Sequence, residues 1–254
     1  LYGLIGVNMG MLSNNPSVIP GRPKNEYWPW EEGLIKARAE AGCKIMRMPI
    51  TANRLADSTG RIVPTVIEYM NYIQNALNLA QKYGIRVIVD AHTNFKYKGV
   101  VQSGEFWANF WSDFNASFGY LVWAIGIANE PYDMTNEAVF SRMQTVITRL
   151  RKEGYEGVIA VGGNHYSTAV NWETYGEHLF DLVDPLDNLI FEGHGYLNSS
   201  GIYDEDSKNV LVAPTAYVEK FQPMWERCKA RGKKMYIGEF GMVKDNACLL
   251  YTSP

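Results

Sequence analysis

The chain has 254 residues, of which 46% are hydrophobic and 20% charged, a composition that indicates a globular protein with a substantial core. The net charge of −3 argues against nucleic acid as a partner, and the longest apolar run, residues 121–128, is too short to cross a membrane. Three cysteines show no CxxC spacing and no neighbouring histidine cluster, so we expect no structural zinc site; because three cannot all pair with one another, we expect no disulfide framework either.

Strand-like and helix-like segments alternate along the whole chain. The strand-like segments are short apolar runs, and the helix-like segments repeat apolar residues at helical spacing and stop at glycines. The sequence predicts strands over residues 4–9, 45–50, 85–89, 121–127, 158–161, 189–191 and 235–237. It predicts helices over residues 30–41, 66–83, 105–118, 138–152 and 214–230.

This alternation is typical of an α/β protein with parallel strands and right-handed crossovers. A doubly wound sheet would usually carry a glycine-rich phosphate loop after its first strand. That strand here ends in VNMG, without GxGxxG or a Walker lysine, so a (β/α)8 TIM barrel is the better interpretation. Only seven strands can be counted, and we therefore expect the barrel to lack its last strand–helix unit.

Polar side chains stand at the ends of five of the predicted strands, where packing alone would favour apolar residues. The active site of an α/β barrel lies at the carboxyl ends of its strands, so each such position is informative. The polar residues are Arg47 in MRMP, His92 in DAH, Asn129 and Glu130 in ANEP, His194 and Tyr196 in HGY, and Glu239 in GEFG. We expect these side chains to meet at one end of the barrel.

The two glutamates of this set, Glu130 and Glu239, are expected to face each other across the barrel mouth. Hydrolysis of a glycosidic bond with retention requires two carboxyl groups roughly 5–5.5 Å apart, one protonated and one ionised. A cationic Arg47 near Glu239 would keep that carboxylate ionised, whereas Glu130 beside a negative Glu239 would hold its proton. We therefore expect Glu239 to be the nucleophile and Glu130 the acid/base.

Simpler interpretations exist for each residue alone. A glutamate at one strand end is more often a salt-bridge partner than a catalyst, but the ordered set reverses that weighting. A carbohydrate-binding barrel without activity would not require a carboxylate pair. A metal-dependent barrel hydrolase would require clustered histidine and aspartate ligands at the strand ends, which the sequence lacks, so we expect no metal and no cofactor.

With these motifs, the chain resembles glycoside hydrolase family 5, the cellulase family of clan A, from GVNMG to GEFG. Residues 184–201, DPLDNLIFEGHGYLNSSG, further resemble the endo-β-1,4-glucanases of that family. The resemblance implies a retaining, endo-acting hydrolase of β-1,4-linked glucan. A mannanase, xyloglucanase or exopolysaccharide depolymerase stays open because this fold changes substrate by loop variation, as does an inactive truncated carbohydrate-binding barrel.

The resemblance also implies roles for the residues around the two glutamates. Asn129 would hydrogen-bond the sugar 2-hydroxyl, and Tyr196 would orient the nucleophile. His92 and His194 would hold hydroxyls or carboxylates at the cleavage point, and Arg47 would complete the substrate-binding set. The implied partner is a polysaccharide, and the implied protein is a secreted monomer, with no signal peptide visible in this sequence.

The aromatic residues depart from the family pattern. Family members carry a tryptophan on strand eight that floors the cleavage subsite, and no residue here can supply it. Trp28, Trp30, Tyr166 and Trp172 are candidates for stacking on the substrate, with core packing as the alternative for each.

The last seven residues, CLLYTSP, fit no helix or strand expected there. They can be back-translated into a string that resembles a sequencing-library adapter, with an ordinary tail as the alternative. We expect residues 1–247 to be a single glycoside hydrolase barrel domain, truncated at its C-terminus, and residues 248–254 to be non-native. A barrel without strand eight exposes two strand edges, so we also expect this chain to fold poorly or hydrolyse little, and a barrel completed with strand eight to be active.

Overall fold

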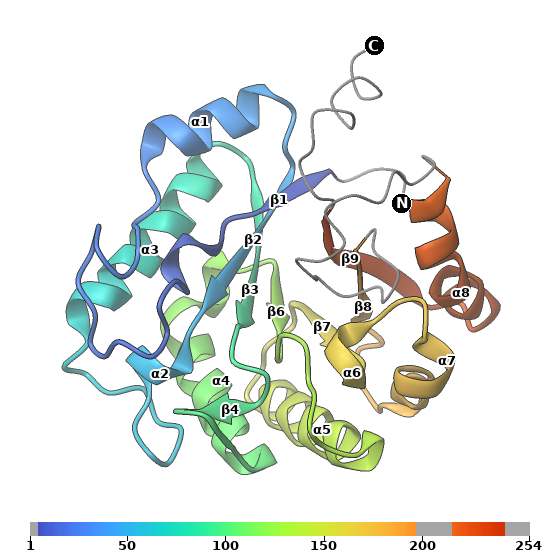
Figure 1. Cartoon of the computed structure of the whole chain (residues 1–254). Coiled ribbons are helices and arrows are strands. Elements are labelled where there is room, and N and C mark those ends of the chain that lie inside the picture. Colours follow the sequence, from blue (N-terminus) through green and yellow to red (C-terminus); the bar gives the residue numbers. More distant parts are fainter. Residues whose placement is uncertain (1–4, 197–214, 242–254) are drawn as a thin grey trace.

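Parallel strands curve into a nearly closed barrel with helices on its outside (Figure 1). The computed structural model describes residues 5–196 and 215–241. Within these ranges the seven barrel strands follow the order β1-β2-β3-β6-β7-β8-β9, so each strand between the two end strands pairs with the barrel strands before and after it in the chain. The predicted TIM-barrel fold is confirmed.

The barrel strands are β1 (Gly6–Asn8), β2 (Ile45–Ile50), β3 (Arg86–Ala91), β6 (Ala124–Gly126), β7 (Val158–Gly162), β8 (Leu189–Tyr196) and β9 (Lys234–Gly241), and β4 (Lys96–Tyr97) and β5 (Val100–Val101) form a small hairpin. The helices are α1 (Glu32–Glu40), α2 (Ala52–Leu55), α3 (Ile67–Lys82), α4 (Gly104–Phe118), α5 (Asn136–Lys152), α6 (Asn164–Ser167), α7 (Trp172–Tyr175) and α8 (Ala216–Ala230).

The strands that carry polar residues are longer than their sequence patterns predict. The sequence predicts strands over residues 189–191 and 235–237, but β8 continues to Tyr196 and β9 to Gly241. The polar residues thus lie within the strands, where they contact one another inside the barrel. The strand predicted over residues 121–127 is shorter, because residues 119–121 form a 3-10 turn before β6.

Helix α4 fixes the segments that follow β3 and β6, and both segments carry site residues. The helix is rich in buried aromatic side chains that pack edge to face, which holds their indole and phenyl rings in defined positions. Trp107 donates a hydrogen bond from Nε1 to the carbonyl of Phe95 at 3.2 Å. Trp111 donates to the carbonyl of Ile127 at 2.9 Å.

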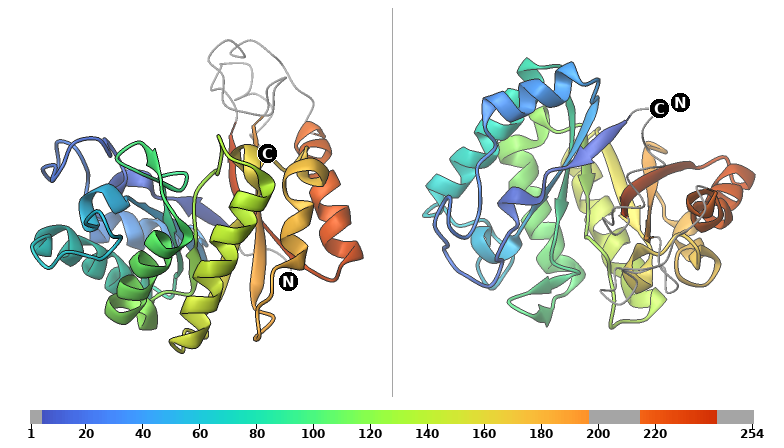
Figure 2. Two further views of the ribbon diagram at one scale, coloured as in Figure 1. Left: turned by 90° about the horizontal axis from the view of Figure 1, so that it is seen from below. Right: turned by 45° about the horizontal axis from the view of Figure 1, so that its top comes forward.

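The sheet ends at β1 and β9, and a seam between them leaves the barrel unsealed over the described residues (Figure 2). Asn8 bridges this seam by donating a hydrogen bond from Nδ2 to the carbonyl of Gly238 at 2.9 Å. Two large apolar residues of β9 are exposed, Ile237 at 44% and Phe240 at 65%. The expectation of a barrel with one strand–helix unit fewer agrees with this arrangement.

No described helix combines the length and the apolar character needed to cross a membrane.

Candidate active site

Strand β8 brings three polar residues to one face. Side chains alternate along a strand, so Glu192, His194 and Tyr196 all point toward the barrel interior. Glu192 and His194 are each 2% exposed. The Tyr196 hydroxyl donates a hydrogen bond to Glu239 Oε2 at 2.5 Å, which links β8 to the next strand.

A β-bulge in β9 turns Glu239 into the barrel. The pairing of β9 with β8 skips Gly238, which is therefore the extra residue of the bulge. An extra residue reverses the alternation of side chains beyond it. Tyr236 and Glu239, three residues apart, consequently both contact residues inside the barrel, and Phe240 is exposed.

Glu130 lies in the loop after β6 with a left-handed backbone, at φ +43°. This conformation is unfavourable for a residue with a side chain, so its surroundings must stabilise it. Asn94 donates a hydrogen bond from Nδ2 to the Glu130 carbonyl at 2.8 Å. The backbone N–H of Tyr166 donates to the carbonyl of Pro131 at 3.1 Å, so loops from two further strands hold the segment.

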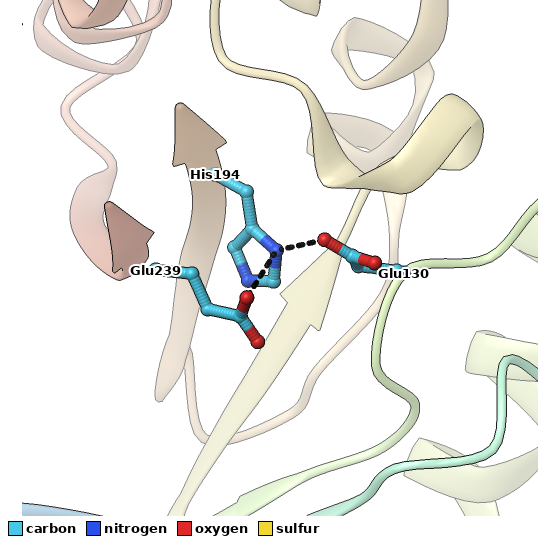
Figure 3. A group of neighbouring side chains, drawn as sticks. All are labelled: Glu130, His194 and Glu239. Atoms are coloured by element: carbon cyan, nitrogen blue, oxygen red, sulfur yellow. Dashed lines mark hydrogen bonds and ion pairs between the residues drawn. The ribbon is translucent and has the colours of Figure 1, made fainter. Parts of the chain in front are cut away.

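The side chains of Glu130, His194 and Glu239 converge at the mouth of the barrel (Figure 3). His194 Nδ1 lies 2.8 Å from Glu130 Oε1 and 3.9 Å from Glu239 Oε2. One carboxylate oxygen of each glutamate and the imidazole nitrogen all lie within 4.8 Å of one another. The glutamate side chains are 23% and 15% exposed, so both reach solvent from a largely buried setting.

Arg47 on β2 connects four strand ends, although only 2% of it is exposed. Its Nη1 donates to Glu239 Oε1 at 2.8 Å, and its Nη2 donates to Asn129 Oδ1 at 2.7 Å. Nη2 also lies 3.2 Å from Asp90 Oδ2, and Nε lies 3.2 Å from Glu192 Oε1. The guanidinium is thereby held in one orientation, with one edge on Glu239.

The charges of Glu239 and His194 stabilise each other. Burial raises the pKa of Glu239, but the cationic His194 and Arg47 and the hydrogen bond from Tyr196 outweigh it and lower this pKa to about 2. Burial lowers the pKa of His194, but hydrogen bonds to Glu130 and Glu192 raise it to about 10. At neutral pH, these shifts favour a carboxylate at Glu239 and an imidazolium at His194.

All seven residues that the sequence predicts for the site lie in or beside this cluster. His92 is at its edge, with Nδ1 3.3 Å from Asp90 Oδ2 and 35% of its side chain exposed. Asn129 is buried at 4%, and its Oδ1 is oriented by Arg47. The catalytic and substrate-binding roles assigned to the seven residues stay predictions.

Sequence reasoning did not select two buried carboxylates, Asp90 and Glu192. Asp90 is 1% exposed and contacts Arg47 and His92, and Glu192 contacts Arg47 and His194. A signal for Glu192 exists in the sequence. Polar residues at every second position of an otherwise apolar strand, as in EGHGY, indicate one polar face inside the barrel.

The aromatic candidates divide between core and surface. Trp30 and Trp172 are buried at 2% and 0%, so both pack in the core, and stacking of either on a substrate is excluded by this burial. Trp28 is 38% exposed. Tyr166 is half-buried and stacks on Tyr132, with ring centroids 4.9 Å apart and planes at 21°. Tyr132 stands two residues after Glu130, and the backbone of Tyr166 is hydrogen-bonded to Pro131 of the same loop.

The Glu130–His194–Glu239 cluster also has the residue types of a metal site. Both ring nitrogens of His194, however, already face carboxylate oxygens, Nδ1 that of Glu130 and Nε2 that of Glu192 at 3.1 Å. A doubly protonated imidazole has no lone pair to offer a metal ion. The geometry therefore favours a proton-sharing network over metal coordination.

The model of one protein family, cellulase (glycosyl hydrolase family 5), matches residues 12–253. The chain belongs to glycosyl hydrolase family 5. This family 5 chain is 28% identical over 254 residues to a probable endo-β-1,4-glucanase B of Neosartorya fischeri, covering 98% of this chain and 75% of that protein. It is 26% identical over 249 residues to endo-β-1,4-glucanase A of Emericella nidulans, covering 96% and 74%.

Among solved structures, the family 5 chain is similar to Pseudomonas stutzeri endoglucanase Cel5A in complex with cellobiose. The TM-score is 0.85 at 26% identity, over 93% of this chain and 73% of that one. The chain is thus a glycoside hydrolase of family 5 related to endoglucanases.

Proposed function

We propose that this protein is a retaining endo-β-1,4-glucanase in which Glu239 is the nucleophile and Glu130 the acid/base. One observation carries the proposal: a carboxylate oxygen of each glutamate lies within 4.8 Å of the other. Retaining glycosidases hold their carboxyl groups about 5–5.5 Å apart, whereas inverting enzymes need about 6.5–9.5 Å to admit a water molecule. The short separation supports direct attack by a carboxylate.

In the first step, Glu239 attacks the anomeric carbon while Glu130 gives its proton to the glycosidic oxygen. The bond between that carbon and oxygen breaks, the leaving chain departs with a new hydroxyl, and a glycosyl ester forms on Glu239. In the second step, Glu130 takes a proton from water, and the resulting hydroxide displaces Glu239. The low pKa of Glu239 keeps it ionised and makes it a good leaving group in this step.

The neighbouring side chains match these two steps. Arg47 and Tyr196 both donate hydrogen bonds to Glu239, one to each oxygen, which fixes the plane of its carboxylate. Because Asn129 accepts from Arg47 through Oδ1, its amide NH₂ is the group turned to other partners, and it can donate to a sugar hydroxyl. His92, partly exposed at the edge of the cluster, would hold a further hydroxyl.

The substrate class rests on the relatives. Two are named as endo-β-1,4-glucanases, and a similar endoglucanase was solved with cellobiose. A β-glucan chain is too large to enter a cell, so an enzyme that cuts it acts outside, as proposed for this one.

The test is a reducing-sugar assay on carboxymethylcellulose, mannan, xyloglucan and xylan. We expect highest activity on carboxymethylcellulose and a loss of about 10³-fold or more in kcat for Glu130→Gln and Glu239→Gln. Glu105→Gln, an exposed glutamate of α4 paired with Arg149, is the matched control and should retain wild-type rates. Preference for mannan or xyloglucan would overturn the substrate, and full rates in both glutamate variants would overturn the mechanism.

A further inference from the structure

A single carboxylate oxygen of Glu192 contacts both His194 and Arg47. Its Oε1 lies 3.1 Å from His194 Nε2 and 3.2 Å from Arg47 Nε. His194 continues to Glu130, and Arg47 continues to Glu239. The side chain of Glu192 is 3% exposed, so this buried carboxylate reaches each glutamate through one intermediate cation.

The bulge in β9 leaves the space that Glu192 fills. A Cβ atom on Gly238 would lie 2.0 Å from Glu192 Oε1 and 2.7 Å from Cδ, far inside van der Waals contact. The missing side chain of Gly238, the residue before Glu239, therefore leaves room for the Glu192 carboxylate. Gly238 therefore has two effects: as the extra residue of the bulge it turns Glu239 inward, and its missing side chain makes room for Glu192.

We propose that Glu192 is a positioning residue that keeps both N–H groups of His194 in place, so that Glu130 must carry its catalytic proton on the oxygen turned away from His194. This inference rests on the proposed function of Glu130. If each ring nitrogen carries a proton, Nε2–H donates to Glu192 Oε1 along the 3.1 Å contact and Nδ1–H donates to Glu130 Oε1 along the 2.8 Å contact. Glu130 Oε1 cannot carry a proton pointing at His194, because Nδ1–H already occupies the line between the two atoms. The acid proton of Glu130 is therefore on Oε2.

Loss of the Glu192 charge has a defined consequence for this proton. A neutral His194 that keeps its Nε2–H offers a lone pair at Nδ1. Glu130 would then donate its proton to Nδ1 instead of the glycosidic oxygen. The charged groups that face His194 are Glu192 on its own strand, Glu130 from the loop after β6 and Glu239 from β9. Arg47 of β2 contacts the same oxygen of Glu192 that contacts His194.

The decisive experiment is ¹⁵N NMR titration of the histidine side chains, which needs no turnover. The chain has four histidines, so His194→Asn assigns the resonance. We expect the wild type to keep both His194 N–H protons up to a pH of about 10. In Glu192→Gln, His194 should lose one of its two N–H protons at a pH about one unit or more below that of the wild type. The reason is that the variant lacks the negative carboxylate that stabilises the imidazolium.

The kinetic counterpart is the pH profile of kcat/KM on aryl β-cellobiosides. In Glu192→Gln the alkaline limb of the kcat/KM profile should move to lower pH. The decrease in kcat/KM should be about tenfold larger for a phenyl leaving group than for a dinitrophenyl leaving group, because dinitrophenolate departs without a proton. Glu105→Gln should change neither limb.

Two results would overturn the proposal. One is a wild-type His194 that loses a proton near the ordinary imidazole pKa of 6.5, which requires no variant to fold. The other is a folded Glu192→Gln protein with an unchanged titration of His194. If the protein cleaves no β-glucan but the NMR titration follows expectation, the proposed function fails and the positioning of His194 stands.

Discussion

At the scale of single residues, Arg47 organises most of the site. Its guanidinium contacts side chains that belong to β3, β8 and β9 and to the loop after β6. Arginine suits this place because its planar fork offers five donors in fixed directions, which lysine cannot reproduce. Removal of one partner from a buried ion pair typically costs about 3–5 kcal/mol, so the network responds as a unit.

We expect Arg47→Lys to lower kcat/KM by about 100-fold or more, because a single ammonium cannot hold Glu239 and Asn129 together. The pKa of Glu239 should also rise from about 2 toward its ordinary value of 4.5, which moves the acidic limb of the kcat/KM profile to higher pH. Arg86→Lys, at the exposed opposite end of β3, is the control. An acidic limb that stays in place would contradict the assigned role of Arg47.

The sequence predicts the site residues well because their chemistry is local to short motifs. Glu130 in ANEP and Glu239 in GEFG are visible as polar residues beside apolar runs. Asp90 and Glu192 were not selected, since a buried carboxylate that supports a cation resembles any polar residue at a strand end. For Asp90, the packing of strand ends around Arg47 makes the distinction, whereas Glu192 is also marked by the alternating polar residues of EGHGY.

At the scale of elements, the bulge in β9 decides which side chains enter the barrel. Regular alternation would place Tyr236 and Gly238 inside and Glu239 outside. No sequence rule applied to MYIGEFG reveals the bulge, which explains why the predicted strand stops at residue 237. The lengths of β8 and β9 were underestimated for a related reason, because polar residues inside a barrel mouth look like the end of a strand.

Gly238→Ala should lower activity by about 100-fold and the free energy of unfolding by about 1–3 kcal/mol, because its Cβ would displace Glu192. Activity on an aryl cellobioside and urea unfolding would measure the two effects. Gly33→Ala in α1 is the matched control, since its Cβ meets nothing within 4 Å and alanine favours a helix by about 0.5–1 kcal/mol. Wild-type activity in Gly238→Ala would show that the bulge tolerates a side chain.

At the scale of the whole molecule, the strand–helix alternation and the absence of a glycine-rich phosphate loop predict the barrel, and the count of seven strands predicts its open seam. The fold follows from apolar periodicity repeated along the chain, and each repeat adds one unit to the same sheet. The seam residues could not be anticipated in detail. The contact of Asn8 with Gly238 joins residues far apart in sequence, and nothing in either motif indicates it.

The coupled charges predict how global stability depends on pH. The pKa of Glu239 is lowered from 4.5 to about 2, so its contribution is present above pH 4.5 and is lost as the pH falls toward 2. The pKa of His194 is raised from 6.5 to about 10, so its contribution is present below pH 6.5 and is lost as the pH rises through 10.

The free energy of unfolding, measured in urea across this pH range, should therefore be highest between pH 4.5 and pH 6.5, the ordinary pKa values of the two groups. His194→Asn should remove the alkaline part of the decline, on the order of a few kcal/mol. Parallel curves for the wild type and His194→Asn above pH 6.5 would show that this imidazolium contributes nothing to folding.

The most direct test of the carboxylate pair is the anomeric form of the product released first. ¹H NMR during hydrolysis of a cello-oligosaccharide distinguishes the β-anomer from the α-anomer before they interconvert. With one carboxylate oxygen of Glu130 within 4.8 Å of one of Glu239, the β-anomer should appear first and the α-anomer only later by mutarotation. Initial release of the α-anomer would mean that water attacks directly, and Glu239 would not be the nucleophile.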